Sequence, residues 1–305
     1  MDSNPRSWGG HSILLQLPVC RVLIEGLSLF QHQAIFRNYR SFVAPGKESP
    51  RKVDVVCHAD RLDHPPEFSP DAFTVNGQYS PLKKRYGARI EITGFGFRGC
   101  FFRGRNLPVK SSLSVFKEAD FSQPGALENF LRPLVAHLAL DHGGVLLHSV
   151  GVLHRERAFL FSGRSNAGKT TLARKAAAAG YRVLSDDINL VSEVNGGYQA
   201  HKVPFTGEFG RQIENLSGCG SYPLGGLALL EKTSTLTSAL VSPATAIAGF
   251  LAGSPYVNDD PEEFPVLLGV LTRLVRQFPV VRLGAALDDA FESLMDSLLN
   301  CYQNV

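Results

Sequence analysis

The segment from Gly163 to Thr170 has the residue types and spacing of a loop that binds phosphate. It reads Gly-Arg-Ser-Asn-Ala-Gly-Lys-Thr and fits the pattern G-x-x-x-x-G-K-[ST]. An apolar segment, Ala158–Ser162, precedes it, and an Ala-rich segment predicts a helix from Lys169 to about Ala179. Such a loop points backbone N–H groups at phosphate oxygens, and the helix start adds the positive end of its dipole. The sequence therefore predicts binding of a nucleoside triphosphate with magnesium.

Individual positions of this motif have separate expected roles. Lys169 would neutralise charge on the β- and γ-phosphates, and the hydroxyl of Thr170 is placed to coordinate magnesium. Asn166 stands where related loops often carry glycine, but asparagine tolerates the left-handed backbone better than most residues. The alternative is an ordinary Gly-rich turn. The residues expected to contact the nucleotide are Gly163, Arg164, Ser165, Asn166, Ala167, Gly168, Lys169, Thr170 and Thr171.

Two adjacent carboxylates, Asp186 and Asp187, follow the apolar segment Tyr181–Ser185. An acidic residue at the end of a strand beside a phosphate loop can hold magnesium, and a second one can accept a proton from an attacking hydroxyl. The alternative is that both aspartates only cap the next turn, a common use of Asp. Their position favours the functional interpretation.

His148 stands upstream, at the end of the apolar segment Val145–His148. A single histidine is more often an ordinary core or edge residue than a catalytic one. Only its expected position on a strand next to the loop makes it a candidate for the active site.

The order of His148, Lys169 and the Asp186-Asp187 pair resembles the kinases that phosphorylate serine on the phosphocarrier protein HPr. The resemblance covers about Gly125 to Tyr302. It implies an ATP-dependent kinase with Mg²⁺, in which Lys169 positions the phosphates and Asp186 accepts the proton. It also implies that His148 orients or tunes Asp186, that Thr170 and Asp187 hold the metal, and that the two aspartates could exchange roles.

The same resemblance points to Glu208 as an active-site glutamate, although the glycine-rich signature of the family is altered around it. The N-terminal half does not resemble the regulatory domain of HPr kinases, so HPr is not the expected substrate. Looser relatives resemble kinases encoded beside peptide-modification pathways. The implied acceptor is a hydroxyl, such as a serine of a peptide or protein, or of a small molecule.

Two regions that differ in composition and hydrophobic pattern must position these residues. From Ser12 to about Lys117, short apolar stretches separated by Pro and Gly predict a β-rich module, and the polar interval Cys57–Tyr86 predicts a loop. Later, apolar residues at intervals of three and four predict a helix, followed by alternating strands and helices. We expect an α/β fold with a P-loop nucleotide-binding domain of HPr-kinase type over residues 122–305. A β-rich domain over residues 1–121 would precede it and recognise the acceptor.

The composition of the chain restricts the classes of partner that the protein is expected to bind. Lys and Arg number 31 against 28 Asp and Glu, a net charge of +3, which does not favour nucleic acid as a partner. No apolar run is long enough to span a bilayer, and Met1–His11 lacks a signal-peptide pattern. We therefore expect a cytoplasmic protein that binds no membrane. The five scattered cysteines are expected to be reduced and mostly buried. A homo-oligomer is left open.

Two other functions remain open from the residues alone. One is a reaction like that of phosphoenolpyruvate carboxykinase, whose core resembles that of HPr kinases but whose longer set of metal and substrate residues is not evident. The other is a nucleotide-binding module that recruits a partner with little turnover. Two lesser segments were also considered. Phe95–Arg103 could be a peptide-binding edge or, with less support, a nucleic-acid surface, but alternating strand residues explain most of its pattern. The acidic cluster Asp259–Glu263 could in principle bind a cation, but a solvated loop is the favoured interpretation.

Overall fold

The chain divides into two compact units, Met1–Val135 and Ala136–Val305. The computed structural model describes residues 6–44, 53–67, 82–104, 108–121, 125–205, 207, 209–210 and 220–303. The division falls inside helix α2 (Ala126–Asp141) rather than at residue 121, where the change in sequence texture occurs. The reason is that the first half of α2 belongs to the core of the first unit, where the ring of Phe130 packs against Gly99.

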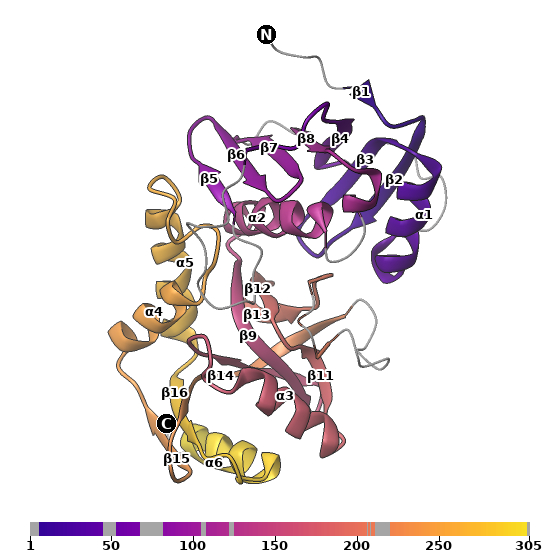
Figure 1. Cartoon of the computed structure of the whole chain (residues 1–305). Helices are drawn as coiled ribbons and strands as arrows, with labels where there is room; N and C mark the ends of the chain where they lie inside the picture. Colours follow the sequence, from indigo (N-terminus) through magenta and orange to yellow (C-terminus); the bar gives the residue numbers. More distant parts are fainter. Residues whose placement is uncertain are drawn as a thin grey trace. The chain divides into compact units, whose positions relative to one another are not determined.

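The first unit is rich in strands, as the sequence predicts. Its sheet runs in the order β2-β3-β4-β8-β7-β6-β5, and β1 pairs with β4 (Figure 1). Strands β3, β4 and β8 are parallel neighbours, whereas β8, β7, β6 and β5 form an antiparallel series. The strands are β1 (Arg6–Ser7), β2 (His11–Gln16), β3 (Arg21–Leu27), β4 (Val55–Arg61), β5 (Lys83–Arg85), β6 (Arg89–Gly94), β7 (Phe97–Phe102) and β8 (Val109–Val115).

The first unit also contains a helix that the sequence analysis missed, α1 (Leu29–Asn38). Its start is a capping box: the Ser28 hydroxyl accepts a hydrogen bond from the Gln31 amide, and the Gln31 side chain accepts one from the Ser28 amide. The S-x-x-Q spacing was a readable signal for this helix start. A short apolar run without clear periodicity concealed the helix.

The prediction of a loop over Cys57–Tyr86 was wrong at both ends. Strand β4 continues to Arg61, and the basic run Lys83–Arg85 forms strand β5 at the end of the described sheet. Residues 68–81 of this interval lie outside the described ranges. Charged residues are common on terminal strands because they discourage pairing with other chains, which accounts for a basic strand at this position.

The second unit is built on another eight-stranded sheet, in the order β10-β9-β12-β13-β14-β16-β15. Strand β11 pairs with β9, and β14 also pairs with β10 in parallel. The strands are β9 (Val145–His154), β10 (Arg157–Ser162), β11 (Arg182–Ser185), β12 (Ile188–Val194), β13 (Gly197–His201), β14 (Ser221–Lys232), β15 (Thr237–Leu240) and β16 (Val280–Ala285). The helices are α3 (Lys169–Ala178), α4 (Pro243–Ala252), α5 (Phe264–Gln277) and α6 (Phe291–Gln303).

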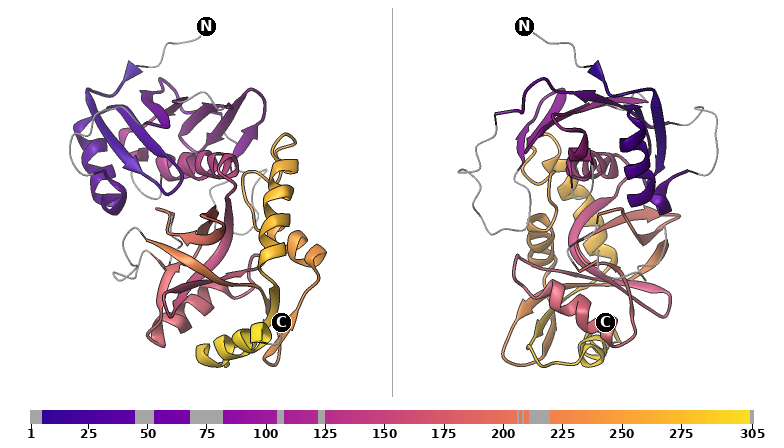
Figure 2. Two further views of the ribbon diagram at one scale, coloured as in Figure 1. Left: turned by 180° about the vertical axis from the view of Figure 1, so that it is seen from behind. Right: turned by 45° about the vertical axis from the view of Figure 1, so that its right-hand side comes forward.

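Helices α3 and α6 lie side by side against this sheet (Figures 1 and 2). Their apolar residues share one core with β9, β10, β14 and β16, in which Leu172, Phe161 and Phe291 are at most 2% exposed. Helices α4 and α5 form a second pair, and α5 contacts β9. Burial of these apolar faces holds the start of α3, and with it the loop before α3, against the ends of the strands.

None of the helices in the described ranges is long and apolar enough to cross a membrane. The four cysteines of the described chain are free thiols, with Cys20 and Cys57 buried and Cys100 and Cys301 partly exposed. Burial raises the pKa of the Cys57 thiol to about 12, so this thiol stays protonated at neutral pH. The structure is a mixed α/β fold with a strand-rich first unit.

Candidate active site

The segment from Gly163 to Gly168 forms a tight turn between β10 and α3. Asn166 has φ of 64° and Gly168, which caps α3, has φ of 101°, so both use the left-handed region. The tolerance expected of Asn166 is therefore confirmed. A Cβ atom on Gly163 would lie 2.8 Å from the carbonyl oxygen of Leu230. Glycine is required there because the loop passes this close to the backbone of β14.

Lys169 lies inside this turn although it is a charged residue. Its side chain is only 7% exposed, and its Nζ donates hydrogen bonds to the carbonyl oxygens of Gly163, at 2.7 Å, and Arg164, at 2.9 Å. Burial lowers the pKa of Lys169, while the charge of Asp187 opposes this shift. The ammonium group is thus held over the concave side of the loop and within the electrostatic reach of Asp187.

Asp186 and Asp187 lie between β11 and β12, at a strand end as predicted, and are 5% and 6% exposed. The carboxylate of Asp186 is used by the backbone: Oδ1 accepts from the amide of Gly207 at 2.8 Å and Oδ2 from the amide of Gly210 at 3.0 Å. A Cβ atom on Gly207 would lie 2.5 Å from Oδ2 of Asp186. Asp186 therefore fixes the segment that follows β13.

Asp187 makes the contact with histidine that the sequence analysis assigned to Asp186. Nε2 of His148 lies 3.4 Å from Oδ1 of Asp187, and the histidine side chain keeps 25% of its surface exposed. The backbone supports the pair, because the amide of Ser149 donates to the carbonyl oxygen of Asp187 at 2.9 Å. The expectation that His148 orients Asp186 is corrected: the recorded partner is Asp187.

His148 is not at a strand end, as the sequence suggested, but within β9, which continues to His154. Its neighbour on β12 is Ile188, the residue after the aspartate pair. On the other side, Ser149 pairs with Ser162, the residue before the loop. The antiparallel strand β9 therefore separates β10 from β11 and β12, and brings His148 next to both the loop and the carboxylates.

Other predicted site residues are exposed or lie outside the described ranges. The side chains of Arg164, Ser165, Thr170 and Thr171 are exposed around the start of α3. Glu208 is outside the described residues. Within the described ranges, no group of three or more His, Cys, Asp or Glu residues could by itself hold a metal ion. Magnesium does not require such a group, because it is normally held by one or two carboxylates together with substrate phosphates.

Two cavities flank the loop. One, of about 260 Å³, lies beside the start of α3. It is lined mainly by apolar side chains and by the stems of two lysines, including Ala167, Thr171, Lys175, Leu230, Lys232 and Leu287. The other, of about 580 Å³, lies between Gly163–Ala167, the end of β14 and helix α4. The first cavity is therefore mainly apolar, whereas the second is lined by both charged and apolar residues.

Three charged residues around these cavities were missed by the sequence analysis: Glu231 and Lys232 at the end of β14, and Arg282 on β16. Arg282 Nε lies 3.3 Å from Oε1 of Glu231. Because β10, β14 and β16 are parallel neighbours, their carboxyl ends meet at one edge of the sheet, where ligands bind in open α/β sheets. The charged pair Glu231-Lys232, directly after the apolar run Leu224–Leu230, was the signal that the sequence offered.

The acidic cluster near Asp259 is not a fully solvated loop, contrary to the expectation from sequence. Asp260 is 0% exposed, and its Oδ2 lies 3.0 Å from Nε2 of His137. This contact joins α2 to the turn before α5 within the second unit. A buried carboxylate needs such a partner, so this aspartate has a structural role.

No curated protein matches the sequence. Among solved structures, the HPr(Ser) kinase/phosphatase from Coxiella burnetii is similar over 52% of this chain and 97% of its own, with 9% sequence identity and a TM-score of 0.30. The family model described as SynChlorMet cassette protein ScmC matches residues 126–300. Since this match spans more than half of the sequence, the chain belongs to the ScmC family of SynChlorMet cassette proteins.

Proposed function

We propose that this protein is an ATP-dependent kinase that transfers the γ-phosphoryl group to a hydroxyl of a peptide, a protein or a small molecule. One observation supports this most: Asp187 is electrostatically coupled to Lys169 of the phosphate-loop motif and contacts His148. A cation for phosphate and a carboxylate–imidazole pair for proton transfer therefore lie together, and phosphoryl transfer to a hydroxyl needs both.

The loop from Gly163 to Gly168 would hold the phosphate chain. The close approach at Gly163 and the left-handed φ at Gly168 give the tight backbone that such a cradle needs. No side chain caps α3 at Gly168, so its first amide N–H groups are available to an anion at the positive end of the helix dipole. Lys169 would exchange its two carbonyl partners for phosphate oxygens.

Magnesium fits the donor set around the loop. The hydroxyl of Thr170, in the first turn of α3, would hold it together with phosphate oxygens and water. Asp187 would be a second ligand only if it does not accept the proton, an alternative that the experiment below distinguishes. When bound, the metal would neutralise charge on the β- and γ-phosphates during transfer.

Asp187 is the better candidate for the proton acceptor, because both oxygens of Asp186 already accept backbone hydrogen bonds. The acceptor hydroxyl would give its proton to Asp187 as its oxygen bonds to the γ-phosphorus. The bond from the γ-phosphorus to the bridging oxygen then breaks, and ADP leaves with that oxygen. His148 would act as a positioning residue that holds the carboxylate.

The apolar cavity of about 260 Å³ would receive the adenine ring. It begins at Ala167 and Gly168, so a nucleotide whose phosphates lie on the loop reaches it directly. Leu230 and Leu287 offer apolar contact to a flat ring, and the lysines at its rim suit the ribose and phosphate side. The order of His148, Lys169 and Asp187 along the chain, which resembles that of HPr kinases, favours a kinase over other nucleotide-binding proteins.

The test separates binding of ATP from transfer. Binding of Mg²⁺–ATP is measured by calorimetry for the full chain and for Asp187→Asn, and transfer of labelled γ-phosphate is followed in an extract of the source cells. We expect Asp187→Asn to lower transfer at least about 100-fold while ATP binding changes less than about threefold. Asp296→Asn, on α6, serves as a matched control that removes a carboxylate outside the site.

Other outcomes would redirect the proposal. Loss of Mg²⁺–ATP binding in Asp187→Asn would indicate that Asp187 is a metal ligand. Asp186 would then be the candidate proton acceptor. Binding of ATP by the unaltered chain without transfer to any component of the extract would favour a recruitment module. Absence of ATP binding would overturn the proposal as a whole.

A further inference from the structure

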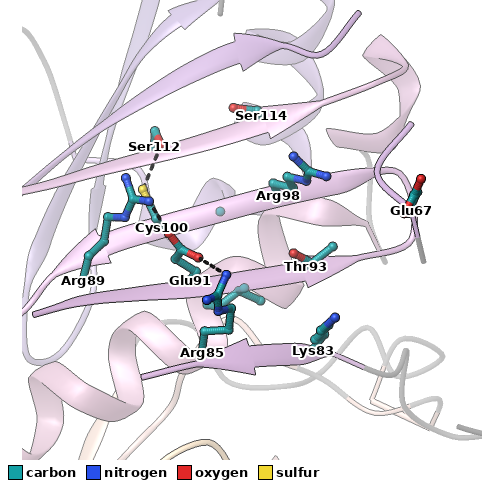
Figure 3. Close-up of a pocket in the computed structure, with 12 residues that line it drawn as sticks. Glu67, Lys83, Arg85, Arg89, Glu91, Thr93, Arg98, Cys100, Ser112 and Ser114 are labelled. Atoms are coloured by element: carbon teal, nitrogen blue, oxygen red, sulfur yellow. Dashed lines mark hydrogen bonds and ion pairs between the residues drawn. The ribbon is translucent and has the colours of Figure 1, made fainter. Parts of the chain in front are cut away.

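Another pocket lies in the first unit, on the polar face of the antiparallel strands β5 to β8 (Figure 3). Its volume is about 440 Å³. The opposite face of these strands is apolar, with Ile90, Ile92 and Leu113 at most 1% exposed. The pocket is lined by Glu67, Lys83, Arg85, Arg89, Glu91, Ile92, Thr93, Arg98, Gly99, Cys100, Ser112 and Ser114.

Strand register arranges its side chains in two rows across the sheet. Lys83 pairs with Thr93, Thr93 with Arg98, and Arg98 with Ser114. The next row contains Arg85, Glu91, Cys100 and Ser112 in the same way. Short hydroxyl and thiol side chains therefore form the floor in both rows, and long cationic side chains stand around it, as Figure 3 shows.

The two rows differ in how their charges are used. In the second row, Glu91 contacts Arg85 at 3.8 Å and also pairs with the neighbouring Arg89. In the first row, Lys83 and Arg98 flank Thr93, and no carboxylate of the described residues pairs with either. A pair of cations separated by a hydroxyl is the arrangement that an anionic side chain would complete.

The Ser114 hydroxyl adds a further polar group to this first row. Ser114 is only 8% exposed and lines the pocket, and within the described residues its hydroxyl has no recorded hydrogen bond. A solvated polar face is the ordinary state of an antiparallel sheet, but such a face does not usually bury a serine at the bottom of a hollow. The row Lys83–Thr93–Arg98–Ser114 therefore gathers two cations and two hydroxyl groups around one hollow.

The extent of the pocket favours an extended peptide as its ligand. Four strands spaced about 4.8 Å apart make each row roughly 14 Å wide, and the rows lie about 7 Å apart along the strands, which matches the spacing of alternate side chains in an extended peptide that runs along them. The cations are spread over this width, so one small anion would reach only some of them. Among the described residues, no aromatic side chain lines the pocket to stack a base, and Glu67 and Glu91 would repel a continuous phosphate backbone.

We propose that this pocket binds an acidic peptide segment, with a carboxylate side chain held between Lys83 and Arg98 above Thr93. A second acidic side chain two residues away would lie about 7 Å along an extended chain and would meet Arg85 and Arg89 in competition with Glu91. This site does not depend on phosphoryl transfer. It predicts that the first unit binds its own class of partner, an acidic peptide.

The experiment measures peptide binding by the full chain in the absence of nucleotide. The probe is a fluorescent peptide with glutamate at alternating positions, and its partner probe carries glutamine instead. We expect the glutamate peptide to bind more weakly as salt rises, and Lys83→Gln/Arg98→Gln to lower its affinity about tenfold through the loss of two ion pairs. Because ATP is absent, failure here would leave the proposed kinase reaction untouched.

A matched control removes two other exposed cations of the same unit, Arg37→Gln on α1 and Arg40→Gln just after it, and should change the affinity less than about twofold. Thr93→Asp keeps both cations but places a carboxylate between them, and should reproduce the tenfold loss. Equal binding of the glutamine peptide, or an equal loss in the control, would overturn the proposal. So would stronger binding of inorganic phosphate or of a single-stranded oligonucleotide used as competitors.

Discussion

The two candidate sites, one in each unit, place charged side chains in opposite environments. In the second unit, Lys169, Asp186 and Asp187 are each less than a tenth exposed, whereas in the first unit the side chains of Arg85 and Arg89 keep 78% and 50% of their surface. A buried charge costs free energy unless hydrogen bonds or an opposite charge compensate it. The site proposed in the second unit is therefore enclosed and preorganised, whereas the site proposed in the first unit is an open surface.

Position on the sheet explains this difference. The buried charges follow β10 and β11, where the chain leaves the sheet and passes between packed elements. The exposed charges lie on the strands themselves, where alternate side chains of β6 and β7 face the core or the solvent. Side chains at strand ends are enclosed, as a site for phosphoryl transfer requires. Side chains on strand faces are spread over a wide surface, as a site for an extended peptide requires.

The largest expected effect comes from removing the buried cation. Lys169→Met should lower the affinity for Mg²⁺–ATP at least about 100-fold, because a cation at the phosphates is lost. Its unfolding free energy should change by less than about 1 kcal/mol, since the relief from burying a charge offsets two lost hydrogen bonds. Calorimetry and urea unfolding measure both.

Lys110→Met, an exposed lysine on β8, is the control for that variant and should leave ATP binding unchanged. If both variants lower the affinity for Mg²⁺–ATP equally, the nucleotide site cannot be assigned to the second unit.

Strain at the loop gives the next effect. Gly163→Ala should destabilise the protein by about 1–3 kcal/mol, because its new methyl group would lie 2.8 Å from the backbone oxygen of Leu230 and from the Cβ of Ala167. Gly10→Ala, where nothing lies within 4 Å of the added atom, should cost less than about 0.5 kcal/mol. Urea unfolding of both variants checks the difference, and similar values would mean that the loop is not tightly packed.

A buried histidine of the second unit predicts acid sensitivity. His201 contacts Ser192 and Ser221, and burial lowers its pKa from 6.5 to about 4. Between these values the unfolded chain binds more protons than the folded chain, so stability falls as pH drops from about 6.5 towards 4. We expect a loss of about 2 kcal/mol from this residue.

Unfolding of the protein and of His201→Gln, measured at several pH values, tests this. The variant should lose less stability over the same window. Parallel curves would show that other groups cause the acid sensitivity.

The smallest effect concerns the pocket of the first unit. Glu91→Gln should raise the affinity for the acidic peptide about threefold, since Arg85 and Arg89 would no longer be held by a carboxylate. Glu25→Gln, on β3, removes a carboxylate paired with His58 elsewhere on the sheet and should have no such effect. Unchanged affinity in Glu91→Gln would confine the binding site to the row of Lys83 and Arg98.

Local signals in the sequence predicted much of the second unit. The motif at Gly163–Thr170, the helix after it and the strand before Asp186 all appear where expected, because each depends on residues close together along the chain. Strands β12 and β13 and the helix α4 were not assigned. Their apolar residues are short runs without a clear period, and pairing with distant strands decided their form.

The sequence alone singled out the residues whose types and spacing predict chemistry: a phosphate-loop motif, a histidine and two adjacent aspartates. Only the tertiary structure decided which of them meet. It paired His148 with Asp187 and gave Asp186 to the amides of Gly207 and Gly210. The reason is physical: neighbours in a chain lie on opposite sides of a strand or turn, so strand pairing, rather than spacing in the sequence, sets the partner of each carboxylate.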